Sequence, residues 1–347
     1  MNLTKTDTLM KSKLAEKRFD AYALLVNLNG NTVFLSSPDA DKETYFDVAS
    51  MGKVLVTSTL ILKACGEKRM MLSDTLEKYF PNVPSEKKNI TVQQLLTHTS
   101  GIVRKEFSRK LADEGRDAMA EFILSVPLAF APGSSYIYSC SGYILLGFIL
   151  EKLYNKPLDE IFYTYLKPQL GLTRARFNIA TDEPNAVACY KREYVGEYMA
   201  DDEIVYAMRG IGGNGASFWT AADIERFIKA VLEKSPVLYP EEYFALAEHD
   251  YTPDFAEGRG LGYQMVDSRY AQTGKLFPEH SFGHCGHTGM SFFINREEKI
   301  YVILLTNATR CLNRQSGFKG YDYGVIMKMR EEIHNAIYED LTLQNLL

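Results

Sequence analysis

A serine and a lysine with the spacing of a catalytic pair occur in the segment Ser50-Met-Gly-Lys53. A serine hydroxyl attacks an acyl group only when a nearby base removes its proton. Positions i and i+3 share one face of a helix, so Lys53 is expected beside the Ser50 hydroxyl. The apolar residues that follow predict burial, which disfavours a charged ammonium and can supply a neutral amine as the base. The segment therefore predicts nucleophilic catalysis through an acyl-enzyme on Ser50.

This motif is short, and the same spacing occurs at Ser85–Lys88 and at Ser316–Lys319. Both of these copies lie in polar sequence typical of loops, where a lysine stays solvated and protonated. Only the Ser50 copy opens a strongly apolar segment, which runs to Cys65 and predicts a helix buried in the core. The competing interpretation is that Ser50 simply caps this helix, so the assignment needs further motifs.

A second candidate is Tyr138-Ser139-Cys140, which follows a Pro-Gly turn at 132–133 and precedes an apolar stretch that predicts a helix. A tyrosine hydroxyl near an ammonium can share or relay the serine proton, so Tyr138 is a candidate member of the base system. The chain has 22 tyrosines, and a single tyrosine usually serves packing. The assignment of Tyr138 therefore depends on its context.

A third candidate is the glycine-rich segment that ends in His287-Thr288-Gly289-Met290 and enters the predicted strand 291–295. Glycine on a strand permits close approach by a ligand or by another backbone. An edge strand here is expected to offer the Met290 N–H, together with the Ser50 N–H, as an oxyanion hole. One such donor contributes roughly a hundredfold to a thousandfold in rate.

The same segment supports a rival hypothesis, because His280, His284 and His287 have the spacing of three metal ligands on one helix face. Glycines interrupt this spacing, and each glycine costs about 1 kcal/mol in a helix. On a strand, His284 and His287 would point to opposite faces. No HExxH motif or nearby acidic cluster supports a metal. We therefore expect no metal and no other cofactor, and keep a metal-dependent hydrolase using these histidines as an alternative.

Strands are predicted near both chain ends, with a helix-rich stretch between them. A helix is expected over 3–18, and a hairpin over 21–29 and 32–37 around a Gly-Asn turn. Towards the C-terminus, the pattern predicts strands at 291–295 and 300–307 and a final helix at about 323–340.

The economical arrangement is an α+β fold, in which one antiparallel sheet from both chain termini is flanked by helices and carries an inserted, mainly helical lobe. We expect a single unit over 1–347, with an α/β lobe at about 1–65 and 270–347 and a helical lobe at about 66–269. A cleft between the two lobes is the natural place for a site.

Composition argues against several classes of function. The 347 residues carry a formal net charge of −5, with a pI near 5.8 and no basic stripe, so no nucleic-acid partner is expected. No segment approaches the ~18 apolar residues that a membrane-spanning helix needs, so no membrane partner is expected. The N-terminal residues lack the apolar core of a signal peptide, which predicts a cytoplasmic protein. Five cysteines without a CxxC pair predict free, mostly buried thiols.

In order along the chain, these elements resemble the signatures of the serine β-lactamase/penicillin-binding-protein superfamily, which include Ser-x-x-Lys, a middle polar triad and Lys-Thr-Gly. The likeness is greatest to the class C β-lactamase-like branch, which includes esterases and peptidases and in which the last element is sometimes His-x-Gly. It covers roughly residues 20–310. Besides the motifs, the resemblance includes ITVQQLLTHTSGI (90–102), PGSSYIYSCSGYILLGFILEKLYNKPL (132–158), GGNGASFWTAADIERFI (212–228) and FGHCGHTGMSFFINREEKIYVILLTNAT (282–309).

The resemblance implies a β-lactamase/transpeptidase-like fold and a role for each motif. Ser50 would be the acylated nucleophile, with Lys53 and Tyr138 as the base system. His287 would stand where the family often has lysine, and Met290 N–H would complete the oxyanion hole. The residues expected to bind the substrate or its oxyanion are Cys140, His287, Thr288, Gly289 and Met290.

Two departures from the family pattern bear on the substrate. Cys140 occupies the place of an asparagine that normally bonds substrate and the catalytic lysine, and a thiol is a weak donor and acceptor. Losing such a bond costs about 1–3 kcal/mol. His287 in place of lysine removes a permanent cation, so attraction to a substrate carboxylate would depend on pH.

These departures favour a serine hydrolase acting on a small ester, amide or peptide over an efficient β-lactamase. The expected partner is therefore a small-molecule or peptide substrate, whose identity the sequence does not specify. The alternative of a different class is a non-catalytic β-lactamase-like protein that binds such a ligand in the same cleft. The sequence does not fix the oligomeric state.

Overall fold

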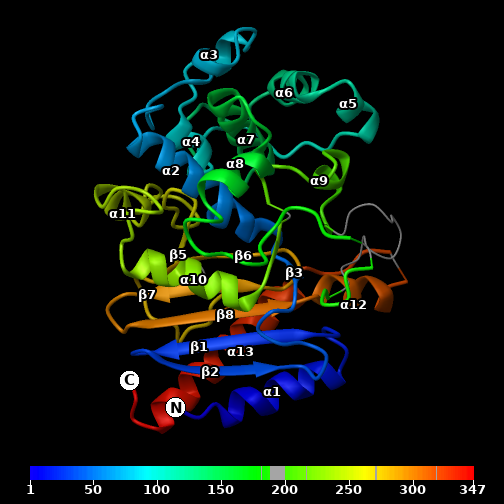
Figure 1. Cartoon of the computed structure of the whole chain (residues 1–347), viewed down its shortest axis with the longest axis vertical. Helices are drawn as coiled ribbons and strands as arrows, with labels where there is room; N and C mark the ends of the chain where they lie inside the picture. Colours follow the sequence, from blue (N-terminus) through cyan, green and yellow to red (C-terminus); the bar gives the residue numbers. More distant parts are fainter. Residues whose placement is uncertain (181, 188–199, 216, 270–271, 318) are drawn as a thin grey trace.

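The computed structural model describes residues 1–347 except 181, 188–199, 216, 270–271 and 318, and it contains a six-stranded antiparallel sheet (Figure 1). The strand order is β2-β1-β8-β7-β6-β5, so the N-terminal hairpin adds to strands from the C-terminal part of the chain. The strands are β1 (Tyr22–Leu28), β2 (Asn31–Ser36), β5 (Gln264–Met265), β6 (Phe282–Cys285), β7 (Ser291–Asn295) and β8 (Ile300–Thr306).

Helices cover both faces of this sheet, which explains why β1 and β8 are buried along their whole length. Helices α1 (Thr4–Ala15) and α13 (Gly324–Leu343) pack on one face, against the side chains of β1 that include Leu24. Helix α10 (Ala221–Leu232) packs on the other face, where Leu25 joins the larger core shared with the helical part of the chain.

The remaining helices lie mostly at one end of the sheet, around α7 (Cys140–Tyr154) (Figure 1). Helix α7 is apolar almost all round and buried along most of its length, as expected for a central core helix. The other elements are α2 (Thr59–Gly66), α3 (Leu76–Tyr79), α4 (Val92–Leu96), α5 (Arg109–Asp113), α6 (Arg116–Ser125), α8 (Leu158–Tyr165), α9 (Glu203–Ala207), α11 (Glu242–Ala247), α12 (Ala308–Gln315) and the paired strands β3 (Phe46–Asp47) and β4 (Phe218–Trp219).

The segment that carries Ser50 and Lys53 is helical but irregular. A 3-10 turn (Ala49–Met51) is followed by a π-helical turn (Lys53–Ser58), which then continues as α2. Ala49 has a φ of +46°, a left-handed value that a non-glycine residue rarely adopts. Strained backbone and π-helical turns are both frequent at functional sites.

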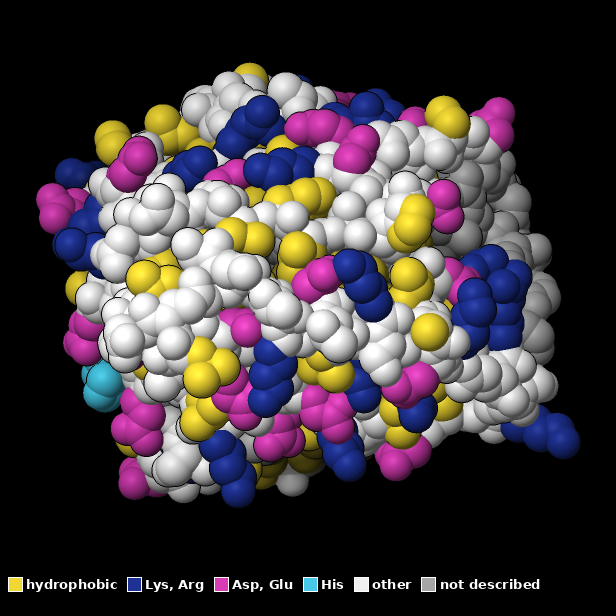
Figure 2. Space-filling view, turned by 90° about the horizontal axis from the view of Figure 1, so that it is seen from below, with side chains coloured by type: hydrophobic (Ala, Val, Ile, Leu, Met, Phe, Trp, Pro, Cys, Tyr) yellow, Lys and Arg dark blue, Asp and Glu magenta, His cyan; other side chains and the backbone are white. Residues whose placement is uncertain are grey.

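The surface at the end that carries α1 and the chain termini bears basic and acidic side chains interspersed with each other (Figure 2). Several of them form ion pairs between or within helices, such as Lys5 with Glu339 and Lys11 with Asp7. Within the described ranges, no helix is both long enough and apolar enough to cross a bilayer.

The predicted α+β class with a sheet from both chain ends is confirmed. The predicted N-terminal helix, hairpin, two closing strands and final helix are all present, with ends that differ by a few residues. Four cysteines (Cys65, Cys140, Cys285 and Cys311) are free and buried, as predicted, whereas Cys189 lies outside the described residues. The division into lobes stays a prediction.

The two glycines of α7, Gly142 and Gly147, are expected to differ in how much their replacement by alanine changes the free energy of unfolding. A Cβ at Gly147 would lie 3.1 Å from the backbone of Gly213, whereas a Cβ at Gly142 would make only an ordinary contact, 3.5 Å from Leu95. We expect Gly147→Ala to lower the free energy of unfolding by about 1–3 kcal/mol through overpacking. Gly142→Ala, the matched control, should be neutral or stabilising by up to about 1 kcal/mol. Urea unfolding of both variants measures the difference, and equal effects would contradict the close approach of α7 to the loop at 213.

Candidate active site

Lys53 and Ser50 are in direct contact, as the sequence predicts. The Nζ atom of Lys53 lies 3.0 Å from the Oγ atom of Ser50, and the Lys53 side chain is fully buried. Lys53 Nζ also lies 2.5 Å from the carbonyl oxygen of Asn214 and 3.6 Å from the Sγ atom of Cys140. Within the described part of the chain, no carboxylate forms an ion pair with Lys53. The geometry therefore lets the Lys53 amine exchange a proton with the Ser50 hydroxyl.

The loop Gly212–Gly215 packs against the segment that carries Ser50 and Lys53. Thr57, one turn after Lys53, donates a hydrogen bond of 2.7 Å to the carbonyl of Gly213. A Cβ on Gly215 would overlap the carbonyl of Ala49. The backbone of this loop therefore touches the segment 47–58 that carries Ser50 and Lys53, which we call the nucleophile segment. The glycines at these positions therefore allow the approach that brings the Asn214 carbonyl to Lys53.

Tyr138 lies at the start of α7 and faces both members of the pair. The Lys53 Nζ atom lies 5.0 Å from the centroid of the Tyr138 ring, over its face. Burial raises the pKa of Tyr138 well above its ordinary value, and a hydrogen bond with Ser50 opposes only part of this rise. Tyr138 is therefore a neutral phenol at neutral pH, suited to relay a proton rather than to act as a phenolate base.

His98 fixes the position of the Tyr138 loop. Its Nδ1 atom accepts a hydrogen bond of 3.1 Å from the backbone N–H of Ser139, and its ring lies 4.5 Å from the Tyr138 ring, centroid to centroid. Burial, together with the positive charge of Arg259 nearby, lowers the pKa of His98 well below its usual value. The imidazole is thus neutral, which leaves Nδ1 free to accept this bond.

The prediction that His287-Thr288-Gly289 forms a strand is wrong. Strand β6 ends at Cys285, and the chain then reverses: Gly286 N–H donates to Met290 O, and Gly289 N–H donates to Gly286 O. Gly289 has a φ of +101°, a turn conformation that a strand residue does not adopt. The sequence contains two consecutive His-x-Gly triads, and the earlier one, His284-Cys285-Gly286, enters the site as a strand.

Gly286 brings this strand end against the nucleophile segment. A Cβ at Gly286 would lie 2.8 Å from the carbonyl of Val48 and 3.5 Å from the Cβ of Ala49. His284 is buried beside it, with its Nδ1 atom 2.7 Å from the carbonyl of Cys285. The predicted oxyanion residue Met290 is buried in the core instead and does not line the cavity at Ser50.

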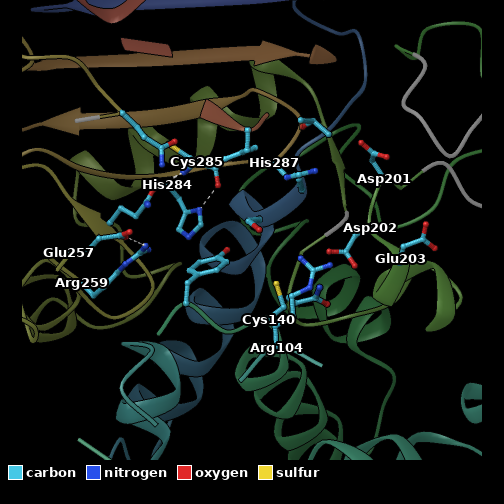
Figure 3. Close-up of a pocket in the computed structure, with 18 residues that line it drawn as sticks. Arg104, Cys140, Asp201, Asp202, Glu203, Glu257, Arg259, His284, Cys285 and His287 are labelled. Atoms are coloured by element: carbon cyan, nitrogen blue, oxygen red, sulfur yellow. Dashed lines mark hydrogen bonds and ion pairs between the residues drawn. The ribbon is translucent and has the colours of Figure 1, made fainter. Parts of the chain in front are cut away.

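A cavity of about 470 Å³ opens at Ser50 (Figure 3). Five of the eight predicted site residues line it: Ser50, Tyr138, Cys140, His287 and Thr288. The Thr288 hydroxyl donates to the carbonyl of Asp47, so it also anchors the nucleophile segment. Lys53 contacts Ser50 but does not itself line the cavity, and neither do Gly289 and Met290.

Several residues of this cavity were not predicted from the sequence. Arg259 is only 2% exposed, donates to Glu257 and to the hydroxyl of Tyr136, and lies 5.4 Å from the Tyr138 ring centroid. Its position in an ordinary Gly-Arg-Gly loop gave no signal. Asn214 lies in the GGNG start of the block 212–228, whose glycines indicate only a turn. Other missed lining residues are Arg104, Asp201, Asp202, Glu203, Gln264 and Gln272.

The two cavity histidines differ in their surroundings. Burial, with Arg259 and Lys53 nearby, lowers the pKa of His284 well below its usual value, so this imidazole is neutral. His287 lies at the mouth, where it stacks on Tyr323 and its Nε2 atom lies 2.8 Å from the Tyr321 hydroxyl. Among the lining residues that the structure describes, the permanent cations are Arg104 and Arg259, and both lie near carboxylates (Figure 3).

The histidine spacing does not produce a metal site. His280 is exposed and does not line the cavity with His284 and His287. Among the residues that the structure describes, no three His, Cys, Asp or Glu side chains are grouped so as to hold a metal ion. The geometry thus gives the metal-dependent alternative no support.

Comparison with known proteins agrees with this fold. A family model described as Beta-lactamase matches residues 6–314, and the chain belongs to this family. A protein of Escherichia coli (strain K12) named "Putative D-alanyl-D-alanine carboxypeptidase" is 25% identical over 323 residues, which cover 83% of this chain and 74% of that protein.

Two solved structures share the fold over nearly the whole chain. The octameric penicillin-binding protein homologue from Pyrococcus abyssi matches with a TM-score of 0.74 and 21% identity, over 99% of this chain and 78% of that one. The β-lactamase/D-alanine carboxypeptidase from Pseudomonas syringae matches with a TM-score of 0.74 and 16% identity, over 97% and 98% of the two chains. At these identities the likeness establishes the fold alone.

The buried histidines predict that stability falls in mild acid. His98 and His284 have pKa values well below the usual 6.5, and burial lowers the pKa of His334 to about 3. Each would titrate near pH 6.5 once unfolded, so below that pH the unfolded chain binds protons that the native protein does not. Each histidine should then cost about 1.4 kcal/mol of unfolding free energy per pH unit below 6.5. Asp47, whose pKa burial raises to about 6, offsets one of them between pH 6 and about 4.

Urea unfolding at pH 7.5 and at pH 5.5 measures this loss. Replacing His334 by Asn should reduce the pH slope by about one proton, whereas His280→Asn, at an exposed position, should leave the slope unchanged. A free energy of unfolding that stays constant over this range would contradict the neutral, buried state of the three histidines.

Proposed function

We propose that the protein is a serine hydrolase that forms an acyl-enzyme on Ser50 with a small ester, amide or peptide substrate. The observation that carries the proposal is the contact of 3.0 Å between Ser50 Oγ and the fully buried Lys53 Nζ, at the base of a cavity that Tyr138 also lines. Membership of the β-lactamase family and the names of its relatives support the same reaction class.

In the proposed reaction, Lys53 takes the Ser50 proton as the Ser50 oxygen bonds to the acyl carbon. The neutral phenol of Tyr138 then gives its proton to the leaving group, and the resulting phenolate takes up the proton that Lys53 removed from Ser50. A water molecule attacks the acyl carbon by the reverse proton route, which releases the acid and restores Ser50. The backbone N–H groups of Ser50 and His287 are the candidates for the oxyanion hole, because both residues line the cavity where Gly286 meets the nucleophile segment.

The polar lining favours an esterase or peptidase over an efficient β-lactamase. Cys140 provides only a thiol beside Lys53, which weakens the hydrogen bonding available to an acyl amide at that position. Carboxylates line the same cavity, and His284 offers no positive charge to a substrate carboxylate. A neutral ester or a peptide segment fits this lining better than an anionic ring acid.

Ser50→Ala should abolish covalent labelling by a fluorophosphonate probe and lower turnover of p-nitrophenyl esters by several orders of magnitude, on the scale of roughly 10⁶. Ser85→Ala is the matched control, because it alters another Ser-x-x-Lys copy that lies away from the cavity. If neither the wild type nor Ser50→Ala is labelled, the protein is a non-catalytic ligand-binding relative. Labelling that survives in Ser50→Ala would place the nucleophile elsewhere.

Cys140→Asn tests whether the weak hydrogen bonding of the Cys140 thiol beside Lys53 limits activity. An amide at this position can donate to an acyl group and accept from Lys53, so kcat/KM for amide-bearing substrates should rise by about tenfold, which corresponds to one hydrogen bond of about 1–3 kcal/mol. Cys140→Ala, which removes the thiol without adding an amide, is the control. A loss of activity in both variants would mean instead that the thiol itself takes part in the reaction.

A further inference from the structure

Asn214 lines the active-site cavity, and its side-chain amide has no hydrogen-bond partner in the protein. The residue is 2% exposed, and both its Oδ1 and its Nδ2 atoms are buried without a hydrogen-bond partner. Buried polar groups are nearly always paired, because an unpaired one costs about 1–3 kcal/mol. An amide with neither end satisfied therefore calls for a partner that is not part of the protein.

The backbone contacts of Asn214 place this residue next to Ser50 and Lys53. Its carbonyl accepts from Lys53 at 2.5 Å, and the neighbouring Gly215 packs against Ala49 and Ser50. Cys140 contacts the same Lys53 nitrogen at 3.6 Å, so Asn214 and the thiol meet at one end of the lysine. Both residues also line the cavity.

The chemistry of a carboxamide limits what it recognises. Its oxygen accepts and its nitrogen donates, so a ligand group that offers one donor and one acceptor satisfies both ends. A secondary amide is such a group, whereas an alkyl chain satisfies neither end. A site with buried hydrogen-bonding groups rejects a ligand that lacks the matching polar atoms, because its own groups then stay unpaired.

We propose that Asn214 is a specificity-determining residue whose side-chain amide binds a secondary amide in the acyl part of the substrate. This inference rests on the proposed acyl-enzyme reaction and deepens it: the substrate class becomes N-acylated amino-acid esters and peptides. In this proposal the acyl amide binds Asn214 and not Cys140. Asn214 belongs to the loop Gly212–Gly215, whereas Cys140 is the first residue of α7.

The test compares two p-nitrophenyl esters of similar shape, those of N-acetylalanine and of 2-methylpentanoic acid, of which only the first carries an amide. Asn214→Leu keeps the approximate size of the side chain and removes both polar atoms. It should lower the ratio of kcat/KM between the two esters by about tenfold or more. Because intrinsic ester reactivity cancels in this comparison of variants, the change in ratio reports the amide contact. An unchanged ratio would overturn the proposal.

Thermal unfolding separates this role from a structural one. Removing two unpaired buried atoms should leave the melting temperature of Asn214→Leu unchanged or raise it. Asn295→Leu is the matched control, since the Asn295 amide has protein partners at both ends, Ser281 and Glu298 among them. That variant should melt lower while keeping the ester ratio. A lower melting temperature for Asn214→Leu together with an unchanged ratio would assign Asn214 to the fold alone.

A binding measurement keeps the inference testable apart from turnover. Calorimetry with N-acetylalaninamide on the Ser50→Ala protein should show affinity that falls by about tenfold or more on adding Asn214→Leu, or Asn214→Ala if the leucine variant does not fold. Equal affinity would overturn the amide contact even if the enzyme is active. Conversely, an inactive wild type that still loses affinity on this substitution would remove the hydrolase proposal and keep the amide site.

Discussion

The site is organised around one buried nitrogen atom, Lys53 Nζ. An amine removed from water must find polar partners within the protein. The three partners here are Ser50 Oγ, Asn214 O and Cys140 Sγ, and they come from the nucleophile segment, the Gly212–Gly215 loop and the start of α7. Each of these segments has to approach closely enough for its atom to reach Lys53. The glycines that permit the contact between α7 and the loop, and the irregular helix that carries Lys53 itself, are consequences of that requirement.

The fold could be predicted because its signals are local and strong. Alternating apolar residues around a Gly-Asn turn predict β1 and β2, and the uniformly apolar run after Ser139 predicts α7. The Ser50–Lys53 contact could be predicted as well, since it depends only on helical spacing. The sequence could not show which of the two His-x-Gly triads lies on the strand at the site, because that depends on where the chain reverses between β6 and β7. Arg259 and Asn214 were equally hidden, since loops deliver them to the cavity from distant parts of the chain.

Several features of the site reduce stability rather than add to it. Ala49 has a left-handed backbone conformation, the Asn214 amide has no protein partner, and the Nε2 atoms of His98 and His284 are buried without a hydrogen-bond partner. Each of these features lowers the free energy of unfolding by about 1–3 kcal/mol, and interactions elsewhere in the structure compensate for this loss. Two continuous cores, one on each face of the sheet, supply that compensation through buried apolar surface. Some departures from the local rules of stability therefore lie at the cavity, as expected when a scaffold supports reactive groups.

The pairing of β1 with β8 joins Leu25 to Ile303 across most of the chain. During synthesis, β1 leaves the ribosome long before its neighbour in the sheet exists, and at ordinary elongation rates the delay is on the order of tens of seconds. The nucleophile segment also lacks one of its contacts until late in synthesis. Thr288, which donates a hydrogen bond to the carbonyl of Asp47, belongs to the same late part of the chain. A ribosome-bound fragment thus carries the serine and the lysine without the wall that β6 provides. The molecule can close its sheet and complete the cavity only when β6, β7 and β8 have been synthesised.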